Sequence, residues 1–76
     1  MSPDMKNNLS IFLKEKRKLL NMSQRALADR AGVGLRFIRD MEQGKTSLDL
    51  AKINQVLGLF GHRMGPVPQE REHDNE

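Results

Sequence analysis

Few residues in this chain have the chemistry that catalysis or metal binding requires. The 76 residues include two histidines and no cysteine, and His62 has no carboxylate at the spacing of a metal-ligand set. His73 lies among Glu70, Glu72 and Asp74, where a solvated polar tail is the simpler interpretation. The sequence contains no nucleophile–base arrangement, no phosphate-binding loop and no dinucleotide-binding fingerprint. We therefore expect a protein that is not an enzyme and that holds neither a metal nor a cofactor.

The charged residues are distributed in a way that favours a polyanionic partner. Residues 1–65 contain 12 basic and 6 acidic residues, a net charge of +6, whereas residues 66–76 contain one base and four acids, a net charge of −3. A basic folded part of this kind is typical of a nucleic-acid-binding protein, but a solvated basic surface gives the same count. Charge alone leaves both interpretations open.

Composition limits the chain to one small domain. With 76 residues, 37% of them hydrophobic, it lies near the lower size limit for an independent core. The lack of cysteine fits a reducing cytoplasm, and no segment approaches the ~20 apolar residues that span a membrane. The pattern predicts a flexible N-terminus over 1–7, a folded domain over 8–61, an extended segment over 62–68 and a disordered acidic tail over 69–76.

Hydrophobic periodicity predicts an all-α fold, a compact domain of four helices. The expected helices span about 8–20, 24–31 and 34–43 and, after a cap at Ser47 or Asp49, a last stretch that reaches Phe60. Their inner faces are expected to contain Leu9, Phe12, Leu13, Leu20, Leu27, Ala28, Ala31, Ile38, Met41, Leu50, Ile53, Val56 or Leu57, and Phe60.

The run Gly32-Val33-Gly34 separates the second helix from the third and decides how the two are joined. A glycine inside a helix costs about 1 kcal/mol relative to alanine, whereas a glycine just after a helix adopts the left-handed conformation without strain. Ala28 is small enough to let the two helices cross closely, and Gly32 supplies the left-handed turn. This combination and spacing predict a helix-turn-helix.

The segment SQRALADRAGVGLRFIRDMEQGKT resembles the helix-turn-helix of the Cro/C1-type (XRE) repressor family, and the similarity covers roughly Leu9 to Phe60. The runs GLRFIRDMEQGKT and NQVLGLFGHRMG and the short acidic tail are most similar to HipB-type antitoxins. Those proteins are small dimeric repressors that partner a HipA-type kinase toxin. The resemblance implies a lambda-repressor-like domain that places its third helix in the major groove of DNA.

The resemblance also implies which residues contact DNA. Base contacts are implied for Gly34, Leu35, Arg36, Arg39 and Asp40. Phosphate contacts are implied for Ser23, Gln24 and Arg25 at a helix start and for the loop residues Gln43, Gly44, Lys45 and Thr46. Arg36 is the strongest of these, because its guanidinium can bind guanine O6 and N7 together, a contact worth about 1–3 kcal/mol of discrimination.

Three positions have roles that the resemblance only partly defines. Gly34 and Leu35 depart from the polar residues that many relatives carry, so specificity is expected to depend on Arg36 and on DNA shape. Phe37 also departs from the pattern, and we expect it to pack against the neighbouring helices.

Arg17 and Glu42 match an ion pair of the family that links the first and third helices.

The residues after the fourth helix resemble the dimerisation part of these repressors. In HipB-like proteins this segment pairs across the two-fold axis as a small β lid, and residues 62–65 are the candidate strand here, with a loop over the chain's own core as the alternative. The expected dimerisation residues are Leu57, Phe60, His62, Arg63 and Met64.

The leading interpretation is a homodimeric, sequence-specific transcriptional repressor of the cytoplasm that binds an inverted-repeat operator. The resemblance further implies the antitoxin of a HipA/HipB-like pair, which represses its own operon. A stand-alone phage-type or housekeeping repressor would have the same features without the toxin. A protein-interaction module with vestigial DNA binding is a third hypothesis. The apolar Leu35 at an implied base-contact position favours it, and the excess of basic residues argues against it.

Overall fold

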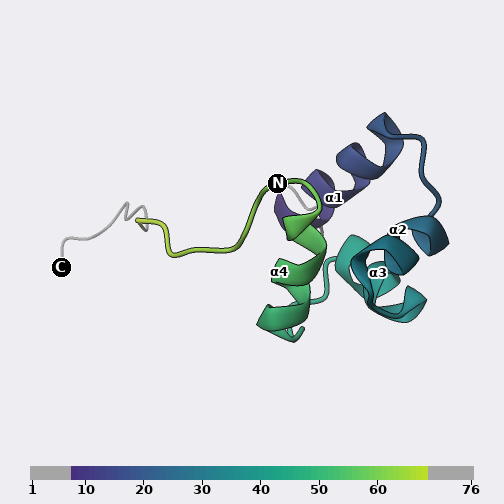
Figure 1. The fold of residues 1–76 in the computed structure, drawn as a ribbon. Coiled ribbons are helices and arrows are strands. Elements are labelled where there is room, and N and C mark those ends of the chain that lie inside the picture. Colours follow the sequence, from purple (N-terminus) through teal and green to yellow (C-terminus); the bar gives the residue numbers. More distant parts are fainter. Residues whose placement is uncertain (1–7, 69–76) are drawn as a thin grey trace, which may run out of the picture.

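The computed structural model describes residues 8–68, and within this range the chain forms four helices and no strand. The helices are α1 (Asn8–Leu19), α2 (Gln24–Ala31), α3 (Leu35–Glu42) and α4 (Leu50–Gly58) (Figure 1). The predicted all-α class is therefore confirmed. The expectations for residues 1–7 and 69–76, including the one for His73, lie outside the described residues.

Two of the helices begin at a side-chain cap that satisfies free backbone N–H groups. The Ser23 hydroxyl accepts a hydrogen bond from the Ala26 N–H at 3.0 Å, and the Asp49 carboxylate accepts one from the Ala51 N–H at 2.8 Å. Of the two caps expected for α4, the structure thus uses Asp49. By contrast, the N-cap of α3 is Gly34, which has no side chain to cap the helix.

The chain leaves each helix through a residue in the left-handed conformation. Within residues 8–68, the residues with positive φ are Asn21 (59°), Gly32 (76°), Gly44 (84°) and Gly61 (72°). After each of them, the next backbone N–H donates back to a carbonyl of the preceding helix: Met22 to Arg17, Val33 to Ala28, Lys45 to Asp40 and His62 to Leu57. This is the Schellman pattern, which satisfies carbonyls that a helix end leaves unpaired.

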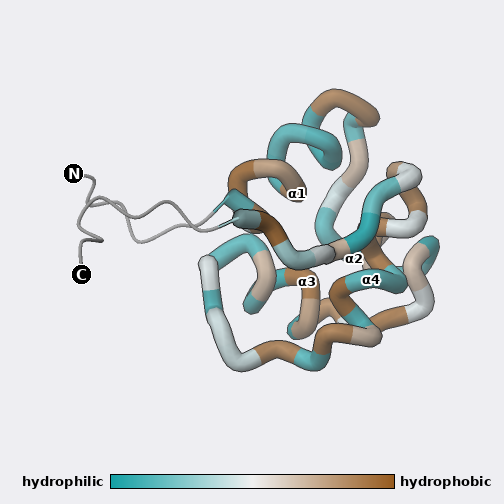
Figure 2. Tube along the Cα trace, turned by 90° about the vertical axis from the view of Figure 1, so that its left-hand side faces the viewer, coloured by the Kyte–Doolittle hydropathy of each residue, from teal (hydrophilic) through white to brown (hydrophobic). Residues whose placement is uncertain are grey.

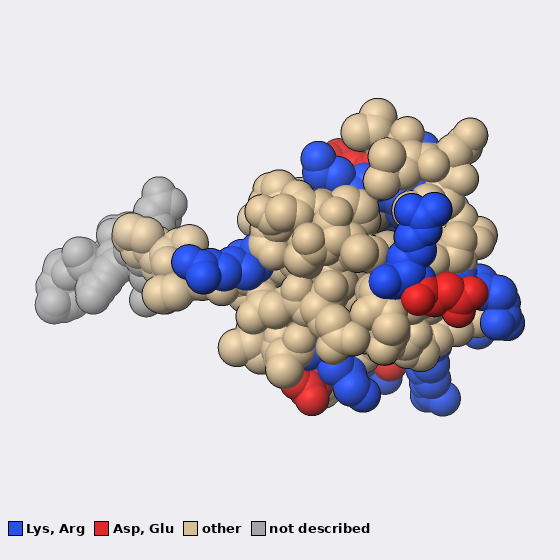
Figure 3. Space-filling view, viewed as in Figure 1, with Lys and Arg blue, Asp and Glu red and all other residues tan. Residues whose placement is uncertain are grey.

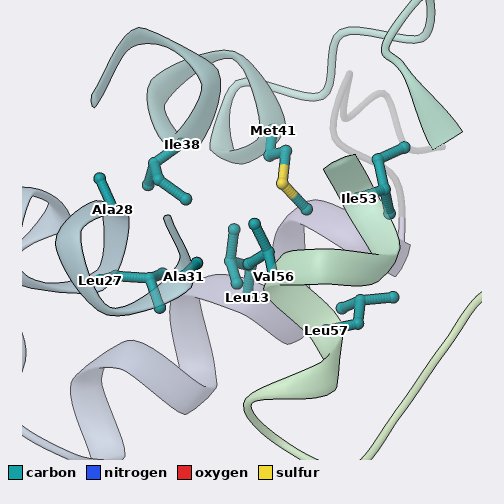
Figure 4. Close-up of a cluster of buried hydrophobic side chains, with 9 residues drawn as sticks. All are labelled: Leu13, Leu27, Ala28, Ala31, Ile38, Met41, Ile53, Val56 and Leu57. Carbon is teal, nitrogen blue, oxygen red and sulfur yellow. The ribbon is translucent and has the colours of Figure 1, made fainter. Parts of the chain in front are cut away.

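The hydrophobic core takes side chains from all four helices (Figure 4). Its buried members are Leu13, Leu27, Ala28, Ala31, Ile38, Met41, Ile53, Val56 and Leu57. Helix α3 packs against α1 and α2, and α2 also packs against α4. Figure 2 shows the consequence along the trace, where hydrophobic stretches alternate with hydrophilic ones because each helix turns one side inward.

The expected inner faces were wrong at two positions. Leu20 is 55% exposed and Leu50 is 56% exposed. Leu20 follows the last residue of α1, where the chain turns away at Asn21, and Leu50 is the first residue of α4. The periodic pattern continues through both positions, but the helices do not extend far enough there to cover them.

The segment after α4 leaves the helical bundle and forms no regular structure (Figure 1). Residues 61–68 are all exposed, and Val67 is 80% exposed. Only the first part contacts the bundle: the Met64 N–H donates to the Asn54 side-chain oxygen at 2.7 Å. Residues 62–68 thus form neither helix nor strand.

Replacing Gly32 by alanine is expected to lower the free energy of unfolding by about 1–2 kcal/mol, the cost of a left-handed residue with a side chain. An added Cβ would also lie 3.2 Å from the Gln55 Nε2. Gly58→Ala is the matched control, because Gly58 is a residue of α4 without a positive φ and a Cβ added there would meet no atom within 4 Å. Urea denaturation measures both, and equal loss in the two variants would contradict the assignment.

Candidate nucleic-acid interface

Helix α3 has a buried side and an exposed side, and the exposed side contains its two arginines. Ile38 and Met41 are fully buried against the core, whereas Arg36 and Arg39 are exposed. Neither guanidinium group has a hydrogen-bond or ion-pair partner among residues 8–68. Figure 3 shows Lys and Arg side chains standing out from the α2–α3 side of the molecule, with a smaller acidic area among them. Two guanidinium groups one helical turn apart are therefore available to an external acceptor.

The remaining residues of the implied base-contact group lie at the two ends of this exposed side. Gly34 and Leu35 form the start of α3, with Gly34 exposed and Leu35 half-buried. Asp40 is half-buried, and its carboxylate lies 3.8 Å from the Lys45 ammonium. A partly exposed pair at this distance contributes little to stability, so the Lys45 ammonium is available to another partner.

The start of α2 presents unpaired backbone N–H groups beside α3. The Ser23 hydroxyl is used as the cap, and the backbone N–H groups of Gln24 and Arg25 have no partner among residues 8–68. Free N–H groups at a helix start, together with the helix dipole, favour an anion such as a phosphate. The structure thus brings Ser23, Gln24 and Arg25 together at one helix end, on exposed or half-buried positions.

The expected pair between Arg17 and Glu42 is present and extends into a small network. Glu42 accepts hydrogen bonds from Arg17 Nε at 2.7 Å, from Arg17 Nη2 at 3.0 Å and from Gln24 Nε2 at 3.0 Å. Arg17 Nη1 also donates to the Met22 carbonyl at 3.0 Å. One network therefore joins α1, the start of α2 and the end of α3. Gln24 has a structural role here in addition to its implied contact with phosphate.

The Glu42 carboxyl keeps its charge although its side chain is only 3% exposed. Burial alone would raise its pKa, but the hydrogen bonds from Arg17 and Gln24 and the positive charges of Arg17 and Lys14 outweigh burial, so its pKa lies below the usual value. The hydrogen bond to Glu42 likewise raises the pKa of Arg17, partly offset by desolvation. The pair is therefore fully ionised at neutral pH.

The loop after α3 has two kinds of residue. Gly44 ends the helix through its left-handed conformation, whereas Gln43, Lys45 and Thr46 are exposed. Phe37, near the start of α3, is half-buried against the core. The Lys52 ammonium lies 5.9 Å from the centroid of the Phe37 ring. The expectation that Phe37 packs within the protein is thus confirmed.

The expected dimerisation residues lie at and after the C-terminal end of α4, but not all of them are exposed. Leu57 belongs to the core, and the Phe60 ring is half-buried and contacts the Phe12 ring edge to face at 6.1 Å. The His62 ring lies 4.8 Å from that of Phe12. Four of the five expected residues, all but Phe60, line an apolar depression of about 230 Å³, which is formed by Asn8, Leu9, Phe12, Leu57, His62, Arg63 and Met64.

No group of three His, Cys, Asp or Glu side chains within residues 8–68 could hold a metal ion. None of the helices in the described part of the chain has the length and apolar character required to cross a lipid bilayer.

Sequence reasoning missed two neighbouring polar residues of α4 that bind backbone groups elsewhere. Gln55 donates its side-chain amide to the carbonyls of Ala31 and Gly32 at 2.8 and 3.2 Å, and Asn54 accepts from Met64. Ser10 was also missed; it is fully buried and engaged in an interaction. The partners of Gln55 are 23 and 24 residues away in the chain, so no local pattern predicts them.

Comparison with known proteins agrees with this architecture. The helix-turn-helix family HTH_3 matches residues 13–61. The chain is also 51% identical over 45 residues to a protein of Sinorhizobium fredii described as "Uncharacterized HTH-type transcriptional regulator y4mF", and the aligned part is 59% of each chain. No solved structure matches. Because the family match covers α2, the turn and α3 as well as most of α1 and all of α4, the chain belongs to the helix-turn-helix family.

Proposed function

We propose that this protein is a sequence-specific DNA-binding transcriptional repressor that inserts α3 into the major groove. The observation that carries the proposal is the exposed arginine side of α3, fixed from behind by the buried Ile38 and Met41. A rigid helix with free guanidinium groups on one side meets the requirement for reading base edges.

The start of α2 and the loop after α3 would position that helix on the phosphate backbone. Free N–H groups at Gln24 and Arg25 can bind one phosphate, and Lys45 can reach another from the far end of α3. Such contacts set the register of the protein on DNA, and the base contacts of Arg36 select the sequence. The net charge of +6 over residues 1–65 supports this division of roles, since it draws the folded part toward DNA.

We further propose that two copies bind an inverted repeat. The apolar depression at the end of α4 lies among the residues expected in the dimer interface, and Leu59, Met64 and Val67 expose apolar surface nearby in the chain. A domain of this size gains stability by covering such surface. In a dimer of this type the two copies of α3 would enter major-groove half-sites about 34 Å apart.

The most specific part of the proposal is that the protein is an antitoxin, and the resemblance to HipB-type antitoxins supports it. On this hypothesis a HipA-like kinase toxin is the protein partner, and the repressed operon encodes both. The neighbouring gene and co-purification of its product with this protein test that level separately. A neighbour without kinase features would leave a repressor that acts without a toxin.

Selection of bound duplexes from a randomised DNA library tests the central proposal. We expect recovery of an inverted repeat whose half-site centres are about 10 base pairs apart. Affinity for that repeat should fall steeply with salt, because each neutralised phosphate releases counterions. Recovery of no motif, with only weak salt-sensitive binding, would contradict specific recognition and favour a protein-interaction module.

A further inference from the structure

The joint between α2 and α3 has a run of carbonyl groups that the backbone does not satisfy. The backbone hydrogen bonds around the turn end on the Ala28 carbonyl, which accepts from Gly32 and Val33 at 2.9 and 3.1 Å. They resume on the Gly34 carbonyl, which accepts from Phe37 at 3.1 Å. Between these two acceptors, none of the carbonyls of residues 29–33 receives a backbone N–H from residues 8–68. Those of Ala31 and Gly32 lie at the turn itself.

One side chain from α4 donates hydrogen bonds to two of these carbonyls. The Gln55 amide nitrogen donates to the Ala31 carbonyl at 2.8 Å and to the Gly32 carbonyl at 3.2 Å. It lies so close to the turn that a Cβ on Gly32 would approach it to 3.2 Å. A donor at this place also faces the negative end of the α2 dipole, which strengthens the interaction.

The start of α3 has no comparable anchor of its own. Its N-cap, Gly34, makes no side-chain hydrogen bond, and an added Cβ there would meet no atom within 4 Å. Core packing of Ile38 and Met41 and the Glu42 network hold the body and the end of α3. The entry into α3 depends on the turn, whose only side-chain ligand within residues 8–68 is Gln55.

We infer that Gln55 is a positioning residue for DNA recognition: by binding both turn carbonyls it holds α3, and with it Arg36, at a fixed angle to α2 and α4. Gln55 would touch neither a base nor a phosphate. The inference deepens the proposed function and rests on it for the DNA measurement only. Because Gln55 is exposed and lies outside the core, its replacement should leave the domain folded.

Amide hydrogen exchange on the free protein is the first test and needs no DNA. In Gln55→Met, which keeps the length of the side chain and removes the donor, exchange at Gly32 and Val33 should accelerate about fivefold, the factor that one net hydrogen bond supplies. Exchange in the core of α1, at Leu13, should stay as in the wild type. Gln55→Lys restores a donor and should restore slow exchange.

The second test compares binding to the selected operator with binding to a scrambled duplex, at a temperature where every variant is folded. Gln55→Met should lower the ratio of the two affinities about fivefold, and Gln55→Lys should keep it. Ala51→Lys adds the same charge one turn earlier on an exposed position of α4 and corrects for electrostatic attraction.

Unchanged exchange at Gly32 and Val33 in Gln55→Met, or equal acceleration in Gln55→Lys, would overturn the inference. Accelerated exchange with an unchanged affinity ratio would overturn it as well, because the amide would then stabilise the turn without orienting α3. If the wild type selects no operator at all, the proposed function fails, and the exchange measurement alone decides whether Gln55 holds the turn.

Discussion

Glu42→Gln is expected to lower the free energy of unfolding by about 3 kcal/mol. The substitution removes the charged acceptor of three hydrogen bonds and leaves the Arg17 guanidinium partly buried without its counter-charge. Breaking a buried pair in this way costs about 3–5 kcal/mol, and the lower end applies because the Arg17 side chain is still 19% exposed. A small domain has a total stability of only about 5–15 kcal/mol, so the effect is large.

Urea denaturation measures this loss, and Asp40→Asn serves as the matched control. It removes a carboxylate from the same helix whose partner, Lys45, is 51% exposed and 3.8 Å away, so we expect less than about 0.5 kcal/mol. Similar losses in the two variants would show that the buried network is not what stabilises the junction of α1, α2 and α3.

The pH dependence of the stability lost in Glu42→Gln follows from the pKa of Glu42. Because that pKa is lower in the folded protein than in the unfolded chain, the contribution of Glu42 is complete above its unfolded value of about 4.3 and is lost as the pH falls through the folded value. The pKa of Arg17 is raised, so its contribution is constant below its ordinary value. The stability difference between wild type and Glu42→Gln should therefore be constant near neutral pH and shrink below about pH 4. A difference that persists there would contradict the ionic origin.

The features that could be predicted from sequence are those determined by residues close together in the chain. The left-handed residue at Gly32 was predicted from the turn between two helical patterns, because glycine adopts that conformation without steric strain. The spacing of apolar residues likewise predicted most of the core. The prediction was wrong at Leu20 and Leu50, because the spacing of apolar residues does not indicate where a helix stops packing against its neighbours.

Polar contacts across the fold could not be predicted in the same way. The side-chain amides of Gln24 and Gln55 bind groups 18 and 24 residues away in the chain. The residues next to them in sequence do not indicate these partners. The Arg17–Glu42 pair was expected only because a family resemblance supplied the long-range partner. A glutamine on an exposed helix position is ordinarily solvated, so its role becomes apparent only when the opposing helix end is placed beside it.

Arg36→Ala is expected to relax sequence preference at one base pair of each half-site. Arg36 is exposed near the start of α3 and has no partner among residues 8–68, so its loss should leave the fold intact. A bidentate contact with guanine is worth about 1–3 kcal/mol, which corresponds to roughly 5- to 150-fold in discrimination. Repeating the library selection with the variant, and titrating operators changed at single positions, measures the effect.

Lys45→Ala is the control that separates specificity from affinity. Lys45 lies in the loop after α3 and forms only a weak surface pair with Asp40, so its removal should weaken binding to all duplexes alike and reduce the salt slope by about 1. Arg36→Ala should instead change the preferred sequence. If both variants lost affinity uniformly and selected the wild-type motif, Arg36 would be a phosphate contact. Recognition would then depend on the remaining α3 contacts, such as Arg39, and on DNA shape.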